Sequence, residues 1–393
     1  MHSVLLLVRS LVNQDVYLKN KMAITPITTV ADLKGKRVLV RGNLNTPVAD
    51  GQITDTYRIE MLIPTVMFLR EAGAQVILCG HLGRDKDASL EPVARYLQDY
   101  IPTVLVRDIL SPSAEETMQY VAPGTVVLLE NLRRYEGEEK NDPAFAERLA
   151  SFADIFVQDD FSVCHREHAS VVGVPALIPS YGGIQLMEEI TQLSKAFTPE
   201  HPFLFILGGA KVDTKMPLMQ QFKDKADTLF IGGVLANDFF KAMGKDIGVS
   251  ATSDKPAPAE ILEEKKIILP HDVVVLRNGK HETVAYDSVL PKDAIYDAGR
   301  KTIADVVSYI KKAKFILWNG PLGYCEEGFC AATLAVAEAI AKSGAHSVVG
   351  GGDTLAAVPD DVQMQFSFVS TGGGAMLDYL ADGDLPGLTA LEN

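Results

Sequence analysis

Glycines and lysines follow an apolar run in the second half of the chain, in a pattern that suits phosphate binding. Phe203–Leu207 leads directly into Gly208 and Gly209, and Lys211 and Lys215 follow four residues apart. A buried strand, a glycine turn and a helix start would point backbone N–H groups at an anion. The two lysines would share one face of that helix. The pattern is not a P-loop, and a turn that only packs a helix is an equal alternative.

A second glycine cluster adds a carboxylate. Gly350–Thr354 reads GGGDT, so Asp353 follows three glycines directly. Backbone N–H groups would face phosphate oxygens there, and the carboxylate suits Mg²⁺, which binds one or two carboxylates together with phosphates. Thr371–Gly374 predicts another helix start with free N–H donors. Glu326, which follows the turn Asn319–Gly323, is a candidate acceptor for ribose hydroxyls, although a plain turn and a solvated carboxylate are the simpler interpretations.

Basic residues follow the predicted strands of the first half. Each of them alone is better explained as a solvated or salt-bridged side chain. Their coincidence at the strand ends of one sheet, in a chain of net charge −14, indicates an anionic ligand. Guanidinium groups match phosphate and carboxylate oxygens in pairs of hydrogen bonds. The residues are Arg41, Arg58, His81, Arg84, Arg133, Arg166 and His168.

The sequence lacks the common arrangements for nucleophilic and metal-assisted hydrolysis. No Ser-His-Asp arrangement stands out, and no HExxH is present. A substrate carboxylate is already ionised at neutral pH, so a reaction that uses it as the nucleophile needs no general base. Positioning and charge neutralisation are the recurring needs of phosphoryl transfer, which this pattern of cations and glycines therefore favours.

The elements that would position these residues form a regular alternation from Lys36 onward. Short Val/Ile/Leu-rich runs alternate with longer segments of helical period, which predicts βαβ units and parallel sheets. Ligands of such sheets bind at the carboxyl ends of the strands. The predicted strands are Arg37–Val40, Gln75–Cys79, Thr103–Val106, Thr125–Leu129, Asp154–Val157, Phe203–Leu207, Thr228–Ile231, Asp272–Leu276, Lys314–Trp318, Ser347–Val349 and Phe366–Val369.

Length and composition bound the remaining possibilities. The 393 residues are too many for one ordinary core, and 47% hydrophobic with 22% charged residues is typical of globular proteins. The net charge of −14 disfavours nucleic acid and anionic membranes as partners. The four cysteines show neither CxxC nor zinc-site spacing, which is typical of a reducing cytosol. No run is long enough to span a bilayer, and residues 1–21 are interpreted as a loose extension.

Several stretches together resemble the phosphoglycerate kinase family, from about Val30 to the C-terminus. They are KGKRVLVRGNLNTP, GHLGR, LLENLR, HREH, LGGAKV, WNGPLG, GGGDT and VSTGGGA, in the order of the family. The resemblance implies an α/β protein with two Rossmann-like domains, parallel sheets flanked by helices, and a hinge helix. It implies 3-phosphoglycerate bound by residues 22–183, MgATP or MgADP bound by residues 184–370, and residues 371–393 returning to the first domain. A cytoplasmic monomer with Mg²⁺ as cofactor is expected.

The resemblance also implies roles for individual residues. Arg58 and Lys211 would neutralise the transferring phosphoryl group, with the N–H groups of Gly351, Gly352, Gly372 and Gly373. Asp353 would bind Mg²⁺. The triose phosphate would contact Asn43, Leu44, Asn45, Arg58, His81, Leu82, Gly83, Arg84, Arg133, Arg166 and His168. The nucleotide would contact Gly209, Ala210, Lys211, Lys215, Gly233, Gly299, Asn319, Pro321, Glu326, Gly351, Gly352, Asp353 and Thr354.

The chain departs from the family pattern at several of these places. The family usually has Asp-Phe-Asn-Val-Pro where this chain has Asn43–Pro47, and Asn-Asp-Ala-Phe-Gly where it has Gln158–Ser162. Asp85 and Arg300 replace prolines, and Glu189 replaces a lysine. These departures leave a degenerate nucleotide-binding relative with a regulatory role as an alternative. A dinucleotide dehydrogenase is a third hypothesis, which the absence of GxGxxG after an early strand disfavours.

Overall fold

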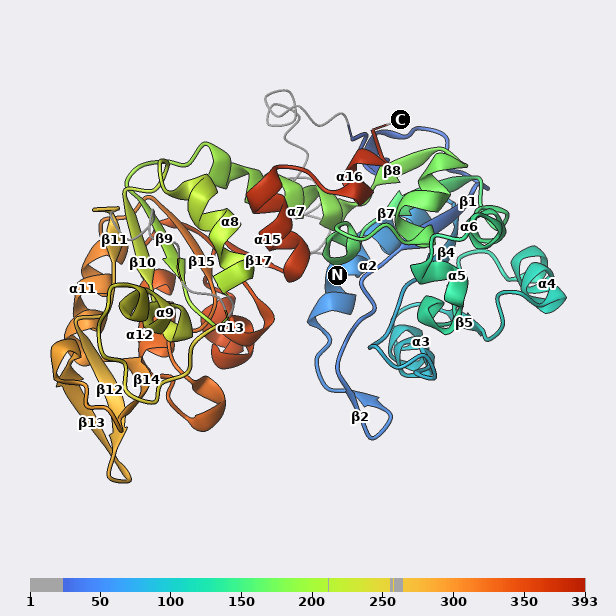
Figure 1. Ribbon diagram of the computed structural model, residues 1–393. Helices are drawn as coiled ribbons and strands as arrows, with labels where there is room; N and C mark the ends of the chain where they lie inside the picture. The colour runs from blue at the N-terminus through green and yellow to red at the C-terminus, as the bar shows by residue number, and fades with distance from the viewer. Residues whose placement is uncertain (1–23, 211, 255–256, 258–263, 393) are drawn as a thin grey trace. The chain divides into compact units, whose positions relative to one another are not determined.

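The computed structural model describes residues 24–210, 212–254, 257 and 264–392, and its contacts divide the chain into two compact units. Unit 1 comprises Met1–Thr191 together with Asp382–Asn393, and unit 2 comprises Gln192–Ala381. Helix α7 (Ile184–Ser194) carries the chain from the first unit into the second (Figure 1). The C-terminal residues belong to unit 1, where the Gly387 N–H donates to the carbonyl oxygen of Cys164 at 2.8 Å.

Unit 1 is built on a six-stranded sheet in which every pairing is parallel, in the order β5-β6-β4-β1-β7-β8. The chain adds β4, β5 and β6 on one side of β1 and then β7 and β8 on the other side. The topological switch point of this sheet therefore lies between β1 and β7. The strands are β1 (Arg37–Arg41), β4 (Gln75–Cys79), β5 (Thr103–Val106), β6 (Val126–Leu129), β7 (Ile155–Gln158) and β8 (Ser180–Gly182).

Helices cover both faces of this sheet because its strands alternate apolar side chains toward both sides. Val38 and Val40 of β1 share a buried core with Leu62 and Val66 of α2, while Leu39, on the opposite face, is also fully buried. A hairpin of β2 (Val48–Ala49) and β3 (Gln52–Ile53) precedes α2. The helices of the unit are α2 (Tyr57–Glu71), α3 (Glu91–Gln98), α4 (Pro112–Tyr120), α5 (Glu136–Glu139), α6 (Pro143–Ala150) and α16 (Pro386–Thr389).

Unit 2 repeats this architecture with a second parallel sheet, in the order β11-β10-β9-β15-β16-β17. The chain adds β10 and β11 on one side of β9 and β15 to β17 on the other side, so the switch point lies between β9 and β15. The strands are β9 (Phe203–Leu207), β10 (Thr228–Ile231), β11 (Ile267–Ile268), β15 (Phe315–Asn319), β16 (His346–Gly350) and β17 (Phe368–Ser370). The helices are α8 (Val212–Phe222), α9 (Gly233–Ala242), α11 (Arg300–Ile310), α12 (Ala331–Ala341), α13 (Gly352–Ala357), α14 (Asp360–Gln363) and α15 (Gly374–Asp382).

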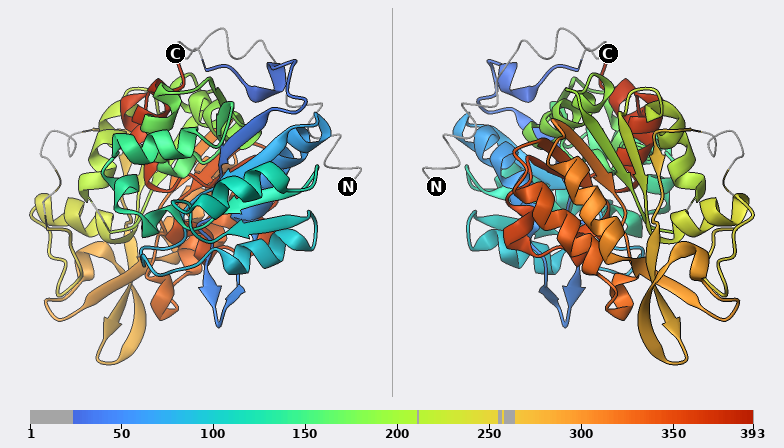
Figure 2. Two further views of the ribbon diagram at one scale, coloured as in Figure 1. Left: turned by 90° about the vertical axis from the view of Figure 1, so that its right-hand side faces the viewer. Right: turned by 90° about the vertical axis from the view of Figure 1, so that its left-hand side faces the viewer.

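Strand β9 shows why this sheet needs helices on both faces (Figure 2). All five of its residues are buried. Leu204 and Ile206 join the core formed with α11 and α12, whereas Phe203 and Phe205 face α8. There the ring of Phe222 lies 6.1 Å from that of Phe203 and 5.4 Å from that of Phe205. The expected α/β class with two parallel sheets flanked by helices is confirmed.

One predicted strand lies outside the parallel sheets. Asp272–Leu276 was expected among the parallel strands, but β12 (Asp272–Arg277) is the middle of an antiparallel sheet between β13 (Lys280–Ala285) and β14 (Ala294–Ala298). The reason is the two-residue turn Asn278-Gly279, with φ of 50° and 74°. Such a turn is the strongest short-range signal for a hairpin. In the described part of the chain, no helix is both long and apolar enough to cross a membrane.

Candidate active site

The carboxyl ends of β9 and β15 bring the glycine turns of unit 2 together at the switch point of its sheet. The N–H of Gly208 donates to the carbonyl oxygen of Asn319 at 2.9 Å, and that of Gly209 to Pro321 at 2.8 Å. A Cβ on Gly208 would lie 2.2 Å from the Pro321 oxygen, and one on Gly233 would lie 2.8 Å from the Gly209 nitrogen. Only glycine fits these positions, so backbone rather than side chain lines the turn.

Lys215 is the buried cation of this site. It lies on α8, is 7% exposed, and its Nζ donates to Oδ1 of Asn319. Burial lowers the pKa of Lys215 to about 8, although the charge of Asp353 acts in the opposite direction. An ammonium group held by a neutral amide beside glycine turns is suited to receive an anion. Lys211, which was predicted to act with it, lies outside the described residues, and Ala210 is exposed at the turn.

The GGGDT turn closes the site from β16. Gly351 adopts a φ of 103°, and Thr354 Oγ1 accepts a hydrogen bond from the Gly320 N–H at 2.8 Å, which ties this turn to β15. Helix α13 begins at Gly352, so the N–H groups of its first turn have no partner within the helix. Asp353 is exposed in that first turn. Gly373, also with a positive φ of 54°, directly precedes α15.

The donor set defines what metal could bind here. The described residues contain no group of three or more His, Cys, Asp or Glu side chains that could hold a metal ion. A single carboxylate such as Asp353 does fit Mg²⁺ that arrives with phosphate oxygens as most of its ligands. Asp353 therefore suits a magnesium ion that arrives as part of a nucleotide complex.

The predicted ribose and adenine positions lie on two other segments of unit 2. Glu326 is exposed on a short 3-10 helix (Cys325–Glu327), and Gly299 is buried directly before α11, where a Cβ would lie 2.3 Å from the Asp272 carboxyl carbon. The sequence analysis missed a disulfide between Cys325 and Cys330, which encloses Glu326 in its loop. The sequence contains little sign of this disulfide. Two cysteines five residues apart match no known metal or redox motif, so their spacing alone did not predict a bond between them.

His81 is a buried member of the group of basic residues predicted at the strand ends of unit 1. This side chain is 4% exposed, and its pKa lies well below the usual value. Burial is the largest cause, followed by the positive charges of Arg41, Arg133 and Arg166 and by His168. Burial also lowers the pKa of His168 to about 4, with further contributions from Arg166 and Arg41. Positive charges around one imidazole would suit an anionic ligand.

Hydrogen bonds hold the loops around these cations. Oδ1 of Asn45 accepts from the Gly83 N–H at 2.8 Å, while Arg58 donates to the Asn45 carbonyl oxygen and Arg133 to that of Gly83. The loops after β1 and β4 are thereby joined. Arg84 and Arg166 are exposed, whereas Leu44 and Leu82 are buried among core side chains. The side chain of Asn131 holds the backbone of Leu82, because it accepts from the Leu82 N–H at 3.2 Å and donates to the Leu82 carbonyl oxygen at 3.0 Å.

Arg41, which contacts His81, is buried together with two carboxylates, Asp160 and Glu138. Arg41 is 1% exposed and forms an ion pair with Asp160 at 3.0 Å. Its Nη2 lies 3.1 Å from Nδ1 of His81, and its Nε donates to Oγ of Ser170 at 3.0 Å. Glu138, 1% exposed, accepts from the same hydroxyl at 2.5 Å. Sequence reasoning included Arg41 and the departure at Asp160, but it missed Glu138, because a buried acid carries no periodicity signal of its own.

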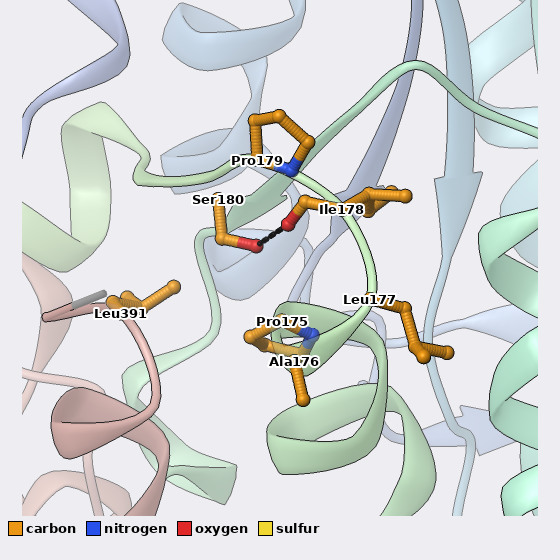
Figure 3. A pocket seen from close by; sticks show the side chains of 7 residues that line it. All are labelled: Pro175, Ala176, Leu177, Ile178, Pro179, Ser180 and Leu391. Carbon is orange, nitrogen blue, oxygen red and sulfur yellow. Dashed lines mark hydrogen bonds between the residues drawn. The ribbon is translucent and has the colours of Figure 1, made fainter.

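A pocket of about 270 Å³ lies elsewhere in unit 1, where the C-terminal segment meets Pro175–Ser180 (Figure 3). Leu391 contributes to its wall, and Ser180 Oγ donates to the Ile178 carbonyl oxygen at 2.8 Å. None of the predicted site residues lines this pocket, and no charged side chain does. It therefore does not compete with the strand-end clusters as the candidate site.

Comparison with known proteins gives a consistent result. The family model described as phosphoglycerate kinase matches residues 27–383. The phosphoglycerate kinase of Mesorhizobium japonicum is 42% identical, with 94% of this chain and 99% of the relative covered, and that of Moorella thermoacetica is 41% identical, with 92% and 97% covered. Phosphoglycerate kinase structures from Coxiella burnetii and Pyrococcus horikoshii match with TM-scores of 0.80 and 0.81 at 37% and 30% identity, each covering 94% of this chain and 98% of the other.

Proposed function

The chain belongs to the phosphoglycerate kinase family, and from this premise we propose that it transfers a phosphoryl group reversibly between MgATP and the carboxylate of 3-phosphoglycerate. The products are ADP and 1,3-bisphosphoglycerate. The observation that carries the proposal is the family match over residues 27–383, and it is supported by the contact of Arg41 with His81 and by the positive charges of Arg133 and Arg166, which also act on that imidazole.

In the proposed reaction, unit 1 binds the triose phosphate. Arg84, Arg133 and Arg166 bind its oxygens as bidentate cations, and His81 donates from Nε2 because its Nδ1 faces Arg41. Neutral histidine is the suitable form here, since a protonated ring would be repelled by the surrounding guanidinium groups. The substrate carboxylate is the nucleophile and needs no base.

Unit 2 binds the nucleotide in the same proposal. Lys215 and the N–H groups of Gly351 and Gly352 receive phosphate oxygens, Asp353 binds the Mg²⁺ that accompanies them, and Glu326 accepts from the ribose. Arg58 and Lys211 neutralise the phosphoryl group during in-line transfer. Transfer requires the two units to close on each other, and we propose α7 as the hinge of a cytoplasmic monomer.

A coupled assay with 3-phosphoglycerate and MgATP tests this function. We expect Arg58→Ala to lower kcat by about 10³-fold or more, because it removes a cation that acts on the transition state. Arg95→Ala is the matched control. Arg95 is 63% exposed on α3, where it pairs with Glu91 one turn away, and its loss should leave kcat within about twofold. Normal turnover by the Arg58 variant would refute its assigned role.

A degenerate relative that only binds nucleotide is the second candidate, and the departures at Asn43, Gln158, Asp160 and Ser162 are the observation that favours it. Calorimetry separates the two functions. A degenerate protein would bind MgADP and release no heat with 3-phosphoglycerate, whereas the enzyme binds both.

A further inference from the structure

Three of the departures from the family pattern in unit 1 are in contact with one another. Asn43 follows β1, and Asp160 and Ser162 follow β7, so all three lie at the switch point of the sheet. Asp160 pairs with Arg41, its other oxygen accepts from Oγ of Ser162 at 2.5 Å, and Nδ2 of Asn43 lies 3.4 Å from the same Oγ. The resembled family pattern has the carboxylate at the position of Asn43 and an alanine at that of Asp160. The carboxylate has therefore moved from one strand end to the neighbouring one.

Counting protons fixes the orientation of the Asn43 amide. The Ser162 hydroxyl has one proton, and it donates that proton to Asp160. Its oxygen can then only accept, so the side of Asn43 that faces it must be the NH₂ group. The opposite orientation would place the amide oxygen against an oxygen with no proton to give. Asp160 itself is held by the ion pair with Arg41, and both side chains are at most 1% exposed.

This orientation leaves a buried acceptor without a partner. Asn43 is 5% exposed, and its Oδ1 has no hydrogen-bond partner among the described residues. An orphaned buried oxygen is unfavourable by about 1–3 kcal/mol unless a ligand supplies a donor. Ionised 3-phosphoglycerate carries phosphate and carboxylate acceptors, and its hydroxyl is its one donor.

We propose that Asp160 and Ser162 are positioning residues of the triose site, which orient the amide of Asn43 so that its oxygen receives the substrate hydroxyl. The inference rests on the proposed function. Asp160 forms the ion pair with buried Arg41, so a carboxylate remains at these strand ends although position 43 holds a neutral amide. A carboxylate at position 43 would need no orientation because its two oxygens are equivalent, whereas an amide has one acceptor and requires Ser162.

A double-mutant cycle tests the exchange of the carboxylate. We expect Asn43→Asp to raise the KM for 3-phosphoglycerate about tenfold or more, because it adds a second carboxylate beside Asp160. We expect Asp160→Ala to raise it similarly, because it removes the ion pair of buried Arg41. The double variant has one carboxylate again and should recover most of the loss, with a KM below that of either single variant.

A second cycle isolates the hydroxyl of Ser162. Ser162→Ala should raise the KM for 3-phosphoglycerate severalfold in the native background, where the amide is then free to turn. In the Asn43→Asp, Asp160→Ala background the same change should add nothing. The KM for MgATP should stay unchanged in every variant, and thermal melting confirms that each one folds. A purely structural role would instead change folding and both KM values together.

The outcomes separate this inference from the proposed function. If the native enzyme turns over 3-phosphoglycerate but the effects at Asn43 and Asp160 simply multiply, the positioning role is wrong and the function stands. An equal effect of Ser162→Ala in both backgrounds refutes the orientation argument in the same way. If the native protein neither binds nor turns over 3-phosphoglycerate, the proposed function fails and this inference fails with it.

Discussion

The buried lysine of unit 2 gives the sharpest test of the nucleotide site. Burial lowers the pKa of Lys215 to about 8, so the group changes charge within a pH range that the protein tolerates. A nucleotide phosphate binds the ammonium form and not the neutral amine. Affinity for MgADP should therefore fall as the pH rises through the pKa of the free site.

The magnitude follows from the fraction of protonated lysine. With a pKa of about 8, about nine-tenths of the free sites carry the charge at pH 7 and about one-tenth at pH 9. The dissociation constant of MgADP should rise about tenfold over this range, which corresponds to about 1.4 kcal/mol. Isothermal titration calorimetry at pH 7, 8 and 9 measures it. The phosphates of ADP are fully ionised throughout, because their last pKa lies near 6.

Lys215→Arg provides the control, since a guanidinium group keeps its charge at every pH used. Its affinity for MgADP should be weaker overall, because the larger group fits the buried position poorly, but should not change between pH 7 and pH 9. The reasoning is refuted if the native protein binds MgADP equally well at pH 7 and pH 9. It is also refuted if the arginine variant shows the same pH dependence as the native protein.

Two further predictions concern stability and the loop of Glu326. Burial lowers the pKa of His168 to about 4 in the folded protein, against 6.5 for a free histidine, so its contribution to stability is present above pH 6.5 and is lost as the pH falls toward 4. Between pH 7 and pH 5, the free energy of unfolding of His168→Gln, measured in urea, should fall by roughly 2 kcal/mol less than that of the native protein, and an equal fall would contradict this. Replacing Cys325 and Cys330 together by serine should weaken MgADP binding severalfold with an unchanged KM for 3-phosphoglycerate, because the disulfide limits the freedom of the loop that carries Glu326; unchanged MgADP affinity would show that the loop needs no such restraint.

The sequence predicted the parts of the fold that depend on burial. Runs such as Phe203–Leu207 are apolar at every position because helices cover both faces, and this pattern is visible without a structure. The hairpin at Asn278-Gly279 could also have been predicted from the sequence, since this dipeptide is typical of two-residue hairpin turns. The apolar residues of β12 before it, however, match the pattern of a parallel strand equally well.

The sequence predicts candidate site residues where the residue types and their positions after strands already indicate a chemical role. Arginines and glycines that follow several strands of one sheet together predict anion binding, whereas the contacts of Asp160 and Glu138 depend on residues that are distant in the sequence. Asp160 lies 119 positions from Arg41 along the chain, and no local pattern connects them. The disulfide of Cys325 and Cys330 was missed for a different reason, because cysteine spacing alone does not determine whether two thiols meet.

The switch point of a parallel sheet explains why the departures of this chain are concentrated where they are. After β1 the chain continues toward β4 on one side, and after β7 it continues toward β8 on the other side. The residues that follow these two neighbouring strands therefore face a shared crevice at the edge of the sheet. Charges in that crevice must balance locally, since Arg41 is buried and cannot be neutralised by water. Loss of a carboxylate after β1 can be tolerated if the strand beside it supplies another. Asn43 and Asp160 are therefore best understood as one exchange across two strand ends, which is the reason that either change alone should be harmful and both together tolerated.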